Sequence, residues 1–493
     1  MWYGYIYYLF AIFLLILTLS FLSKMFFVNN RFYQSLSKQI SLILLSTLNF
    51  IGFCTLFTTY SIYESLLSFS VSISSENLKI LHLGYFTPTD LLSNQYLDLH
   101  LISVYYFPFL YIFILITFIS LYFCLSYNKD ELGSFSVFCT TILFSGYTLF
   151  YTDSLILFFM AYELLLIPSF FILYKFAKTR RSVEAAYLMF FWTQFGAMFL
   201  IFGLLYLFFV SGTSSFAVLQ ECNLNSFELN FIFFCLFVGF GVKLPIWPFY
   251  GWLPKAHVEA STNFSIFLSG VLVKFAFFGF LKILVTLQLD PTFYFVYPFL
   301  TIGICDAVFK LFYQTDLKKL VAYSTVVEMH WLTICVLSGQ SSLMLASFSM
   351  LISHALLSTN SFLIVDAIGR RFKTRLVTEI GGVNFLCPKL FSLGLINLLI
   401  FLGFPGTIMF ISEILFFSFF FDLHASLCML YIVLLYLIGP TMFFRSWLLV
   451  LFGQSTHLSR TIPVDLTSRE LLLLGGLIVL MIWLGISWQS FLF

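Results

Sequence analysis

Five ionisable residues each stand alone inside a long apolar stretch of the sequence: Glu163, Lys243, Lys274, Glu328 and Glu413. The stretch around Glu163, SLILFFMAYELLLIPSFFILY, contains no second charged residue. A charged side chain at the centre of a bilayer costs roughly 3 kcal/mol on insertion scales. A chain that keeps five of them must gain a function in return. We interpret these residues as a path for ions or protons through the interior of the protein.

Proton transfer suits these residue types. Carboxylic acids and amines in apolar surroundings exchange protons closer to neutral pH than they do in water. When a lysine approaches a carboxylate, the ionised pair is favoured, and when the two separate, the neutral pair is favoured and a proton is released elsewhere. We expect this coupling between Glu163 and Lys243.

Two histidines, His330 and His354, lie in later apolar segments. Imidazole can relay a proton near neutral pH, so these side chains could bridge Lys274 to Glu413. The alternative is structural: a buried histidine bonded to a backbone carbonyl, or a buried ion pair that holds helices together. The residues alone leave both alternatives open.

The composition indicates that these residues lie in a membrane. The chain is 61% hydrophobic and 9% charged, whereas roughly a quarter of residues are charged in soluble domains. Polar clusters separate about 14 apolar segments, each long enough to cross a hydrocarbon core of about 30 Å. We expect an all-α polytopic membrane protein with a single transmembrane domain. The predicted spans are 2–23, 40–62, 103–126, 134–151, 153–175, 187–210, 229–248, 262–286, 292–312, 317–338, 341–366, 388–420, 424–448 and 469–492.

The distribution of Lys and Arg agrees with these spans. Of the 24 cations, 20 flank the loops that follow odd-numbered helices, and only Lys79 and Lys282 lie on the opposite side. The remaining two are Lys243 and Lys274. Because basic loops stay on the cytoplasmic or matrix side, we expect both termini on the outer, positive side of the membrane.

Two spans are predicted to be broken. The seventh contains Pro245 and Pro248, and the twelfth contains Gly403, Pro405 and Gly406. Backbone breaks within hydrocarbon are tolerated where the released polar groups face protein or a wet cavity. Helices seven and twelve lie five positions apart in the order of helices. Helices five and ten, which carry Glu163 and Glu328, have the same separation. This offset favours a five-helix unit repeated in inverted orientation, as in many transporters.

The repeat divides the transmembrane domain into four parts. Residues 1–126 hold the three N-terminal helices, 134–286 the first repeat (helices 4–8), 292–448 the second repeat (helices 9–13) and 469–492 the C-terminal helix.

Several cofactor classes are excluded, because the nine cysteines include no C-x-x-C pair and no P-loop, flavin, haem or metal spacing occurs. We read the basic loops as orientation signals that face lipid, and expect no contact with nucleic acid.

The most specific string spans residues 239–282, GFGVKLPIWPFYGWLPKAHVEASTNFSIFLSGVLVKFAFFGFLK. It resembles the signature of the antiporter-like subunits of respiratory complex I. Matches to that family occur in the same order elsewhere and cover helices four to thirteen. They are Tyr162–Glu163 with Ile167–Pro168, Gln314–Lys318 with Ala322–Ser324, His354–Leu356, and Pro405–Thr407 followed by Glu413.

The resemblance implies a role for most of the lone residues. Glu163 and Lys243 would form the coupled pair, Lys274 the central relay and Glu413 the exit-side carboxylate, with His354 between them. It also implies that NADH, flavin, iron–sulfur clusters and ubiquinone bind to other subunits. The partners would be the other membrane-arm subunits, including further antiporter-like ones, and membrane lipids. The location would be the mitochondrial inner membrane. The high count of 69 phenylalanines fits this location, because the mutational bias of an AT-rich organelle genome would raise that count.

This chain departs from the family pattern at two places. Ser261 stands where a proline is common, and Glu328 stands where helix ten usually has a histidine. His330 follows two residues later, about 200° around the helix, and so on another face. Two other functions remain open: a subunit of a multi-subunit cation/proton antiporter, and a structural membrane scaffold whose buried charges only hold helices together.

Overall fold

The computed structural model describes residues 112–113, 115–117, 119–120, 132–177, 179–219, 222, 224–287, 296–454 and 464–487. The predicted spans 2–23 and 40–62 lie outside these residues, and 103–126 is described only in short pieces. The chain forms two compact units, one of residues 1–85 and 121–141, and one of residues 86–120 and 142–493. Of the first unit, only the beginning of helix α5 (Leu132–Tyr151) is described. The account below concerns the second unit.

The described part of the second unit is helical throughout, apart from loops and two isolated bridges between residue pairs. After α5, the first half contains α6 (Leu155–Leu164), α7 (Leu166–Lys175), α8 (Arg180–Ser211), α9 (Phe216–Leu219), α10 (Ser226–Lys243), η1 (Phe249–Gly251), α11 (Trp252–Glu259), α12 (Thr262–Phe267), η2 (Leu268–Leu272) and α13 (Val273–Thr286). The second half contains α14 (Tyr297–Phe312), α15 (Leu317–Leu337), α16 (Ser341–Phe372), α17 (Val383–Leu386), α18 (Pro388–Phe401), α19 (Ile408–Leu423), α20 (Ala425–Ile432), η4 (Val433–Ile438), α21 (Gly439–Phe452) and α22 (Ser468–Ile486).

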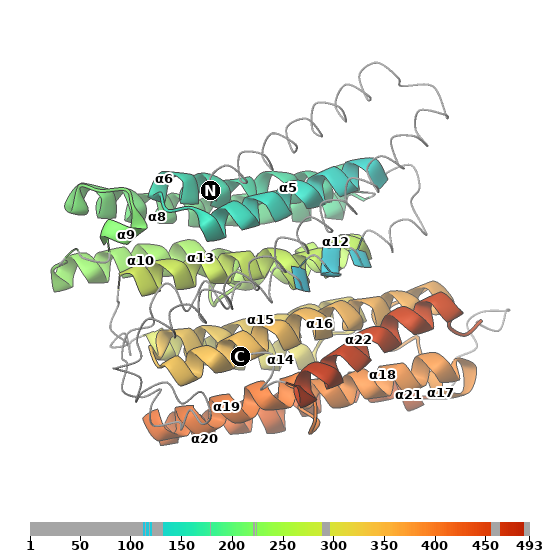
Figure 1. The fold of residues 1–493 in the computed structure, drawn as a ribbon. Coiled ribbons are helices and arrows are strands. Elements are labelled where there is room, and N and C mark those ends of the chain that lie inside the picture. The colour runs from blue at the N-terminus through green and yellow to red at the C-terminus, as the bar shows by residue number, and fades with distance from the viewer. Residues whose placement is uncertain are drawn as a thin grey trace, which may run out of the picture. The chain divides into compact units, whose positions relative to one another are not determined.

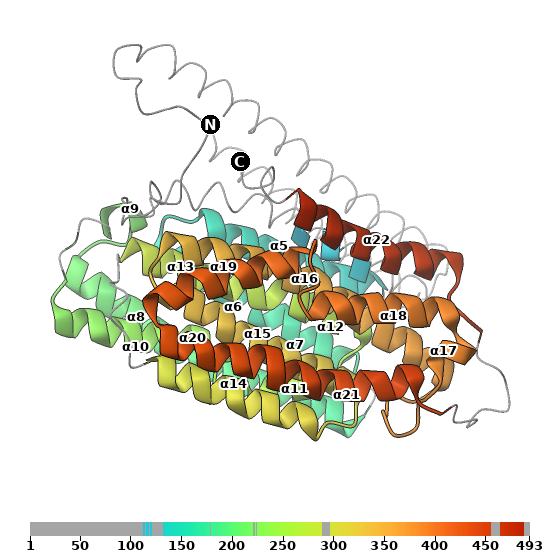
Figure 2. The same ribbon diagram turned by 90° about the horizontal axis from the view of Figure 1, so that it is seen from below.

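The long helices run side by side in stacked layers, with α10 and α13 next to α15 and α16 in Figure 1, and Figure 2 shows the same bundle from below. Eight described helices are long and apolar enough to cross a membrane. Three of them are buried along their whole apolar window: Thr262–Thr286, Leu317–Leu337 and Leu343–Phe372. These central helices carry Lys274, Glu328 and His354, respectively. The all-α prediction is confirmed, whereas the count of 14 helices and the inverted repeat stay predictions.

From residue 134 onward, each predicted span contains a described helix or the segments of a broken one. Residues 292–295 and 488–492 of two spans lie outside the described residues. Two helices extend beyond their predicted ends by six or more residues. α8 begins at Arg180 because Thr179 and Ser182 form a reciprocal capping box, and α16 continues to Phe372. The sequence analysis assigned these charged turns to loops, because hydropathy detects only the part of a helix inside the hydrocarbon.

The predicted break in the seventh span is present between α10 and α11. Pro245 has no backbone N–H, so the carbonyl of Gly241 accepts instead from the backbone N–H of Ile246 at 2.8 Å. The carbonyl of Val242 is paired by the indole Nε1 of Trp252, also at 2.8 Å. Backbone groups released by the break are therefore satisfied by protein, as a membrane interior requires.

The predicted break in the twelfth span separates α18 from α19. Gly403 and Gly406 adopt φ values of 66° and 89°, a region that glycine enters without steric cost. The hydroxyl of Thr407 then accepts a hydrogen bond from the backbone N–H of Phe410 and caps α19. The break therefore ends one helix and starts another within the same span.

Two π-helical segments were not predicted. η2 directly precedes Lys274, and η4 contains Tyr436. Such segments insert one extra residue into a helical turn and are frequent at functional sites. Their positions next to lone charged residues make them part of the site described below.

Lys282 explains one of the two exceptions to the distribution of basic residues. Its side chain is buried, and its ammonium donates to the carbonyls of Phe150 and Thr152 at 2.8 and 2.5 Å. These carbonyls lie at the C-terminal end of α5, where a cation is favoured by the helix dipole. Lys282 is thus a buried helix-capping cation rather than a loop charge.

The last described helix, α22, is joined to α16 by charged side chains. Glu470 pairs with Arg370 at 2.9 Å and with Arg371 at 2.7 Å. Arg370 also pairs with Asp366 at 2.6 Å. These groups are mostly covered, so their hydrogen bonds are screened by water less than those of surface pairs.

We predict that Glu470→Gln lowers the stability of the packed bundle by about 1–3 kcal/mol, because two charge-assisted hydrogen bonds are weakened. The measurement is the thermal midpoint at which the purified protein unfolds. Glu184→Gln is the matched control, since Glu184 pairs with Arg180 in the open, with side chains 63% and 93% exposed. Equal midpoints for the two variants would contradict a role for Glu470 in holding α22.

Candidate functional site

The site begins where α6 meets the end of α10. Lys243 is 1% exposed, and its ammonium donates to the backbone carbonyl of Tyr162 at 2.7 Å and lies 3.3 Å from the centre of the same residue's ring. The Tyr162 hydroxyl donates to the carbonyl of Gly239 at 2.9 Å. Tyr162 therefore fixes both the end of α10 and the position of the lysine.

Glu163 is the next residue along α6 and interacts electrostatically with Lys243. The two side chains form no ion pair in the described structure, and Oε1 of Glu163 is buried without a hydrogen-bond partner. The predicted pair is thus brought together without direct contact. Lys243 is held by a neutral carbonyl beside the carboxylate, which leaves the carboxylate able to accept a proton.

A second group lies at the centre of the bundle. Lys274 is fully buried, its ammonium donates to the carbonyl of Ser269 in η2, and it lies 2.6 Å from Nδ1 of His354. On the other side of the imidazole, Nε2 of His354 lies 3.2 Å from Oε2 of Glu328. These last two atoms are close but not aligned as a hydrogen bond. Lys274, His354 and Glu328 therefore form one row across α13, α16 and α15.

Glu413 occupies the far end of this row, on α19. It is 9% exposed and accepts a hydrogen bond from the hydroxyl of Tyr436. Its carboxylate lies against Gly403, where a Cβ atom would collide with it. The break before α19 therefore makes the space that this carboxylate occupies.

A small cavity joins the two carboxylates at this end. It has a volume of about 60 Å³ and is lined by Glu328, Glu413, Tyr436 and Ser324, among others. A water molecule occupies about 30 Å³ of liquid, so this space can hold on the order of two waters between polar groups. The two carboxylates also repel each other electrostatically, which favours a proton shared within the cavity.

His330 is not part of this row. Its Nδ1 lies 2.8 Å from the carbonyl of Val326, and its Nε2 accepts from the backbone N–H of Trp247 at 2.8 Å. Gly303 on α14 leaves room for the ring, since a Cβ atom there would overlap it. The imidazole thus connects the broken segment after α10 to α15. His330 therefore matches the structural alternative stated above, a buried histidine bonded to the backbone.

Two residues near the site were missed by sequence reasoning. Tyr436 carries no motif, and only its contact with Glu413 identifies it. His257 is fully buried, and its ring stacks on that of Phe362 with 4.9 Å between the ring centres. Neither of its ring nitrogens has a hydrogen-bond partner in the described structure. It interacts electrostatically with Lys318 and Lys274. The sequence marks His257 only by its position within residues 239–282, the string that resembles the family signature, and no role was assigned to it there.

The two groups of the site remain separate in their direct contacts. No hydrogen bond or ion pair among the described residues joins Lys243 to Lys274. Their helices pack through apolar side chains instead, with the ring of Phe240 on α10 close to Gly279 on α13. Within the described ranges, no cluster of three His, Cys, Asp or Glu side chains could hold a metal ion.

Comparisons with known proteins show which family the chain belongs to. A family model described as "NADH:quinone oxidoreductase/Mrp antiporter, TM" matches residues 152–439. The chain is 36% identical over 362 residues to NADH-ubiquinone oxidoreductase chain 4 of Paramecium tetraurelia, covering 72% of this chain and 75% of the relative. It is 32% identical over 375 residues to chain 4 of Marchantia polymorpha, covering 74% of each. NADH-quinone oxidoreductase subunit M of Rickettsia felis is 30% identical and matches over 70% of each chain.

Solved structures share the fold. A chain of Thermus thermophilus respiratory complex I with bound NADH superposes with a TM-score of 0.67 at 20% identity, covering 77% of this chain and 81% of that one. A chain of the Mrp complex from Dietzia gives a TM-score of 0.67 at 16% identity, with coverages of 78% and 81%. Since the family model spans more than half of the sequence, the chain belongs to the NADH:quinone oxidoreductase/Mrp antiporter transmembrane family.

Proposed function

We propose that this chain is an antiporter-like, proton-translocating subunit of the membrane arm of NADH:ubiquinone oxidoreductase. We further propose that it moves protons along the row Lys274, His354, Glu328 and Glu413. The observation that carries the proposal is the contact of both imidazole nitrogens of His354, with an ammonium at 2.6 Å and a carboxylate at 3.2 Å. A histidine between an acid and a base is the arrangement that passes protons most readily.

The first transfer runs through His354. The ammonium of Lys274 gives a proton to Nδ1, while the proton on Nε2 passes to the carboxylate of Glu328. One proton thus moves from Lys274 to Glu328, and the imidazole stays neutral with its proton on the other nitrogen. The ring must then return to its first tautomer before the next transfer.

The second transfer crosses the small cavity. Protonated Glu328 donates to water there, and the water donates to Glu413, whose position is held by Tyr436. Lys274, Glu328 and Glu413 together carry one positive and two negative charges when all are ionised. Net neutrality in this buried cluster therefore requires one added proton, which sets its capacity at a single proton.

Glu163 and Lys243 form the coupling end of the path. Lys243 is held on the carbonyl of Tyr162 rather than on the carboxylate, so a small shift of its ammonium changes the stabilisation of ionised Glu163. The resulting change in local charge alters the field at Lys274. We propose that motion of neighbouring subunits drives this shift, since no redox centre is expected on this chain.

The remaining features of the proposal concern the setting. The relatives named above are subunits of NADH-ubiquinone or NADH-quinone oxidoreductase. By inference from them, NADH, flavin, iron–sulfur clusters and ubiquinone bind to other subunits, and the partners are membrane-arm subunits, including further antiporter-like ones. We place the chain in the mitochondrial inner membrane with both termini on the outer side.

Two rival functions make different predictions. A subunit of a multi-subunit cation/proton antiporter has the same fold, as the Mrp match illustrates, but would not co-purify with flavin and iron–sulfur proteins. Relatives at 30% identity or more carry oxidoreductase names, which favours the oxidoreductase. A structural scaffold would tolerate neutralisation of its buried charges.

We predict that Lys274→Met reduces proton pumping by the assembled complex at least about tenfold, because the row loses its proton donor. The measurement is the pH gradient formed per NADH oxidised in proteoliposomes. Lys255→Met is the control, since Lys255 is exposed and lies outside the row. Intact pumping by assembled Lys274→Met complex would favour the scaffold.

We also predict opposite results for two substitutions at Glu328. Glu328→Gln leaves a side chain of similar size that cannot take up the proton, so pumping falls about tenfold. Glu328→His introduces the residue that the family usually has in this position and retains pumping. The same proteoliposome assay distinguishes the variants. Equal pumping by the Gln and Glu forms would remove Glu328 from the path.

A further inference from the structure

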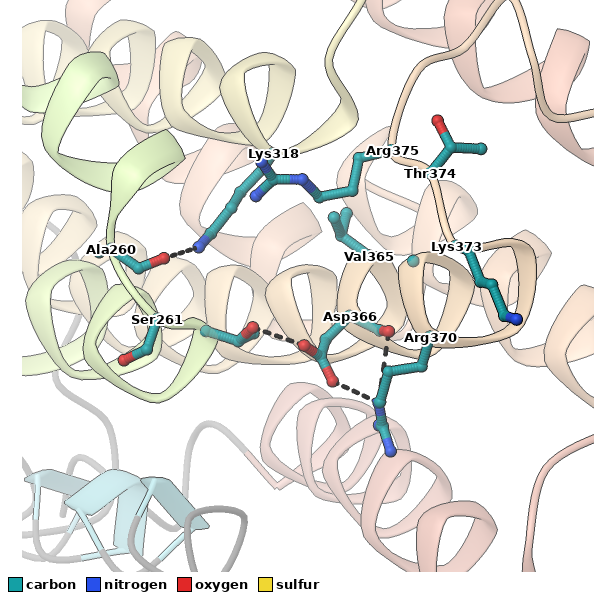
Figure 3. A pocket seen from close by; sticks show the side chains of 11 residues that line it. Ala260, Ser261, Lys318, Val365, Asp366, Arg370, Lys373, Thr374 and Arg375 are labelled. Atoms are coloured by element: carbon teal, nitrogen blue, oxygen red, sulfur yellow. Dashed lines mark hydrogen bonds and ion pairs between the residues drawn. The ribbon is translucent and has the colours of Figure 1, made fainter. Parts of the chain in front are cut away.

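A second polar cavity lies away from the relay, at the end of the bundle where α16 ends. Its volume is about 290 Å³, and it is partly open and lined by the last turns of α16, the connector after it and the starts of α12 and α15. Figure 3 shows four basic side chains on its walls: Lys318, Arg370, Lys373 and Arg375. Asp366 is the only acidic side chain that lines it.

Lys318 is the most informative of these cations. It is 2% exposed, and its ammonium donates to the carbonyl of Ala260 at 2.6 Å. An ammonium has three donors, and Lys318 forms no ion pair in the described structure. Asp366 does not supply one, because it is bound by Arg370 at 2.6 Å and by the Thr262 hydroxyl at 2.5 Å. A buried cation without an ionic partner is costly, so an anion in the cavity would stabilise it.

The other cations leave the cavity with excess positive charge. Lys373 ends α16 in a left-handed conformation with φ of 58° and is exposed at the cavity. Arg375 makes two long contacts, 3.6 Å to Asp316 and 3.3 Å to the carbonyl of Val258. The guanidinium is therefore only loosely held. Arg370 is paired with Asp366 and Glu470, and Arg375 is in long contact with Asp316. The excess positive charge at the cavity therefore comes from Lys318 and Lys373, which form no ion pair in the described part of the chain.

We propose that this cavity binds a phosphate group, carried by an anionic phospholipid or by a soluble phosphate. Guanidinium groups match the geometry of phosphate oxygens, and basic pockets between membrane helices bind phospholipid headgroups. A space of 290 Å³ is at the small end for organic ligands and suits a headgroup. The site is separate from the relay, and the inference does not rest on proton transfer.

The test uses amine-reactive labelling of the purified complex, with Lys373 as the reporter. Lys389 is the internal control, because it is also exposed but does not line the cavity. The complex is placed in phosphatidylcholine nanodiscs and compared with nanodiscs that also contain cardiolipin, with added inorganic phosphate, and with chloride at equal ionic strength. Labelling of each lysine is followed by mass spectrometry.

We predict slower labelling of Lys373, but not of Lys389, when phosphate groups are supplied. Protection by cardiolipin alone identifies a lipid headgroup, and protection by inorganic phosphate as well identifies a site open to soluble phosphate. Arg375→Gln should raise about tenfold the phosphate concentration that gives half-maximal protection of Lys373, which corresponds to the loss of one charge-assisted hydrogen bond. Lys389→Gln should leave that concentration unchanged. Absence of protection in the unmodified complex, or equal protection by chloride, would overturn the proposal.

Discussion

The approach of the Lys274 ammonium to His354 is the interaction on which the rest of the site depends. A buried ammonium without polar neighbours would cost several kcal/mol. Here a carbonyl of η2 and the imidazole contact it, and the carboxylate of Glu328 lies on the far side of the imidazole. These groups come from three different helices, so the lysine can be accommodated only if α13, α15 and α16 pack together at the centre. The three spans that are buried along their whole apolar window are also those that carry Lys274, Glu328 and His354.

The irregular backbone of the bundle follows from the same constraint. Each break or π-helical segment lies beside a lone charged residue: the Pro245 break after Lys243, η2 before Lys274, and the Gly403 break and η4 beside Glu413. A regular helix uses all of its carbonyls internally, whereas an irregular turn releases one to bind a cation or makes space for a side chain. The lone charged residues and the deviations from regular helix therefore lie together.

Much of the site could be predicted because its signals are local. Isolated charges, prolines and glycines are visible in one segment of sequence, and the spacing of Glu328 and His330 correctly placed them on different helix faces: one meets His354 and the other Trp247. Tyr436 and the capping role of Lys282 could not be predicted, because each depends on a partner more than 20 residues away in the chain. Neither π-helical segment has a marker residue in its sequence.

The extra residue in η2 determines which changes of sequence this segment can accept. Each residue turns a helix by about 100°, so insertion of a further residue between Leu268 and Leu272 would rotate Lys274 away from His354. Deletion of one residue can instead be absorbed if the π-helical turn becomes an α-helical turn. Substitutions among similar apolar side chains leave that register unchanged. This short segment should therefore accept many amino-acid exchanges and a single deletion, but no insertion.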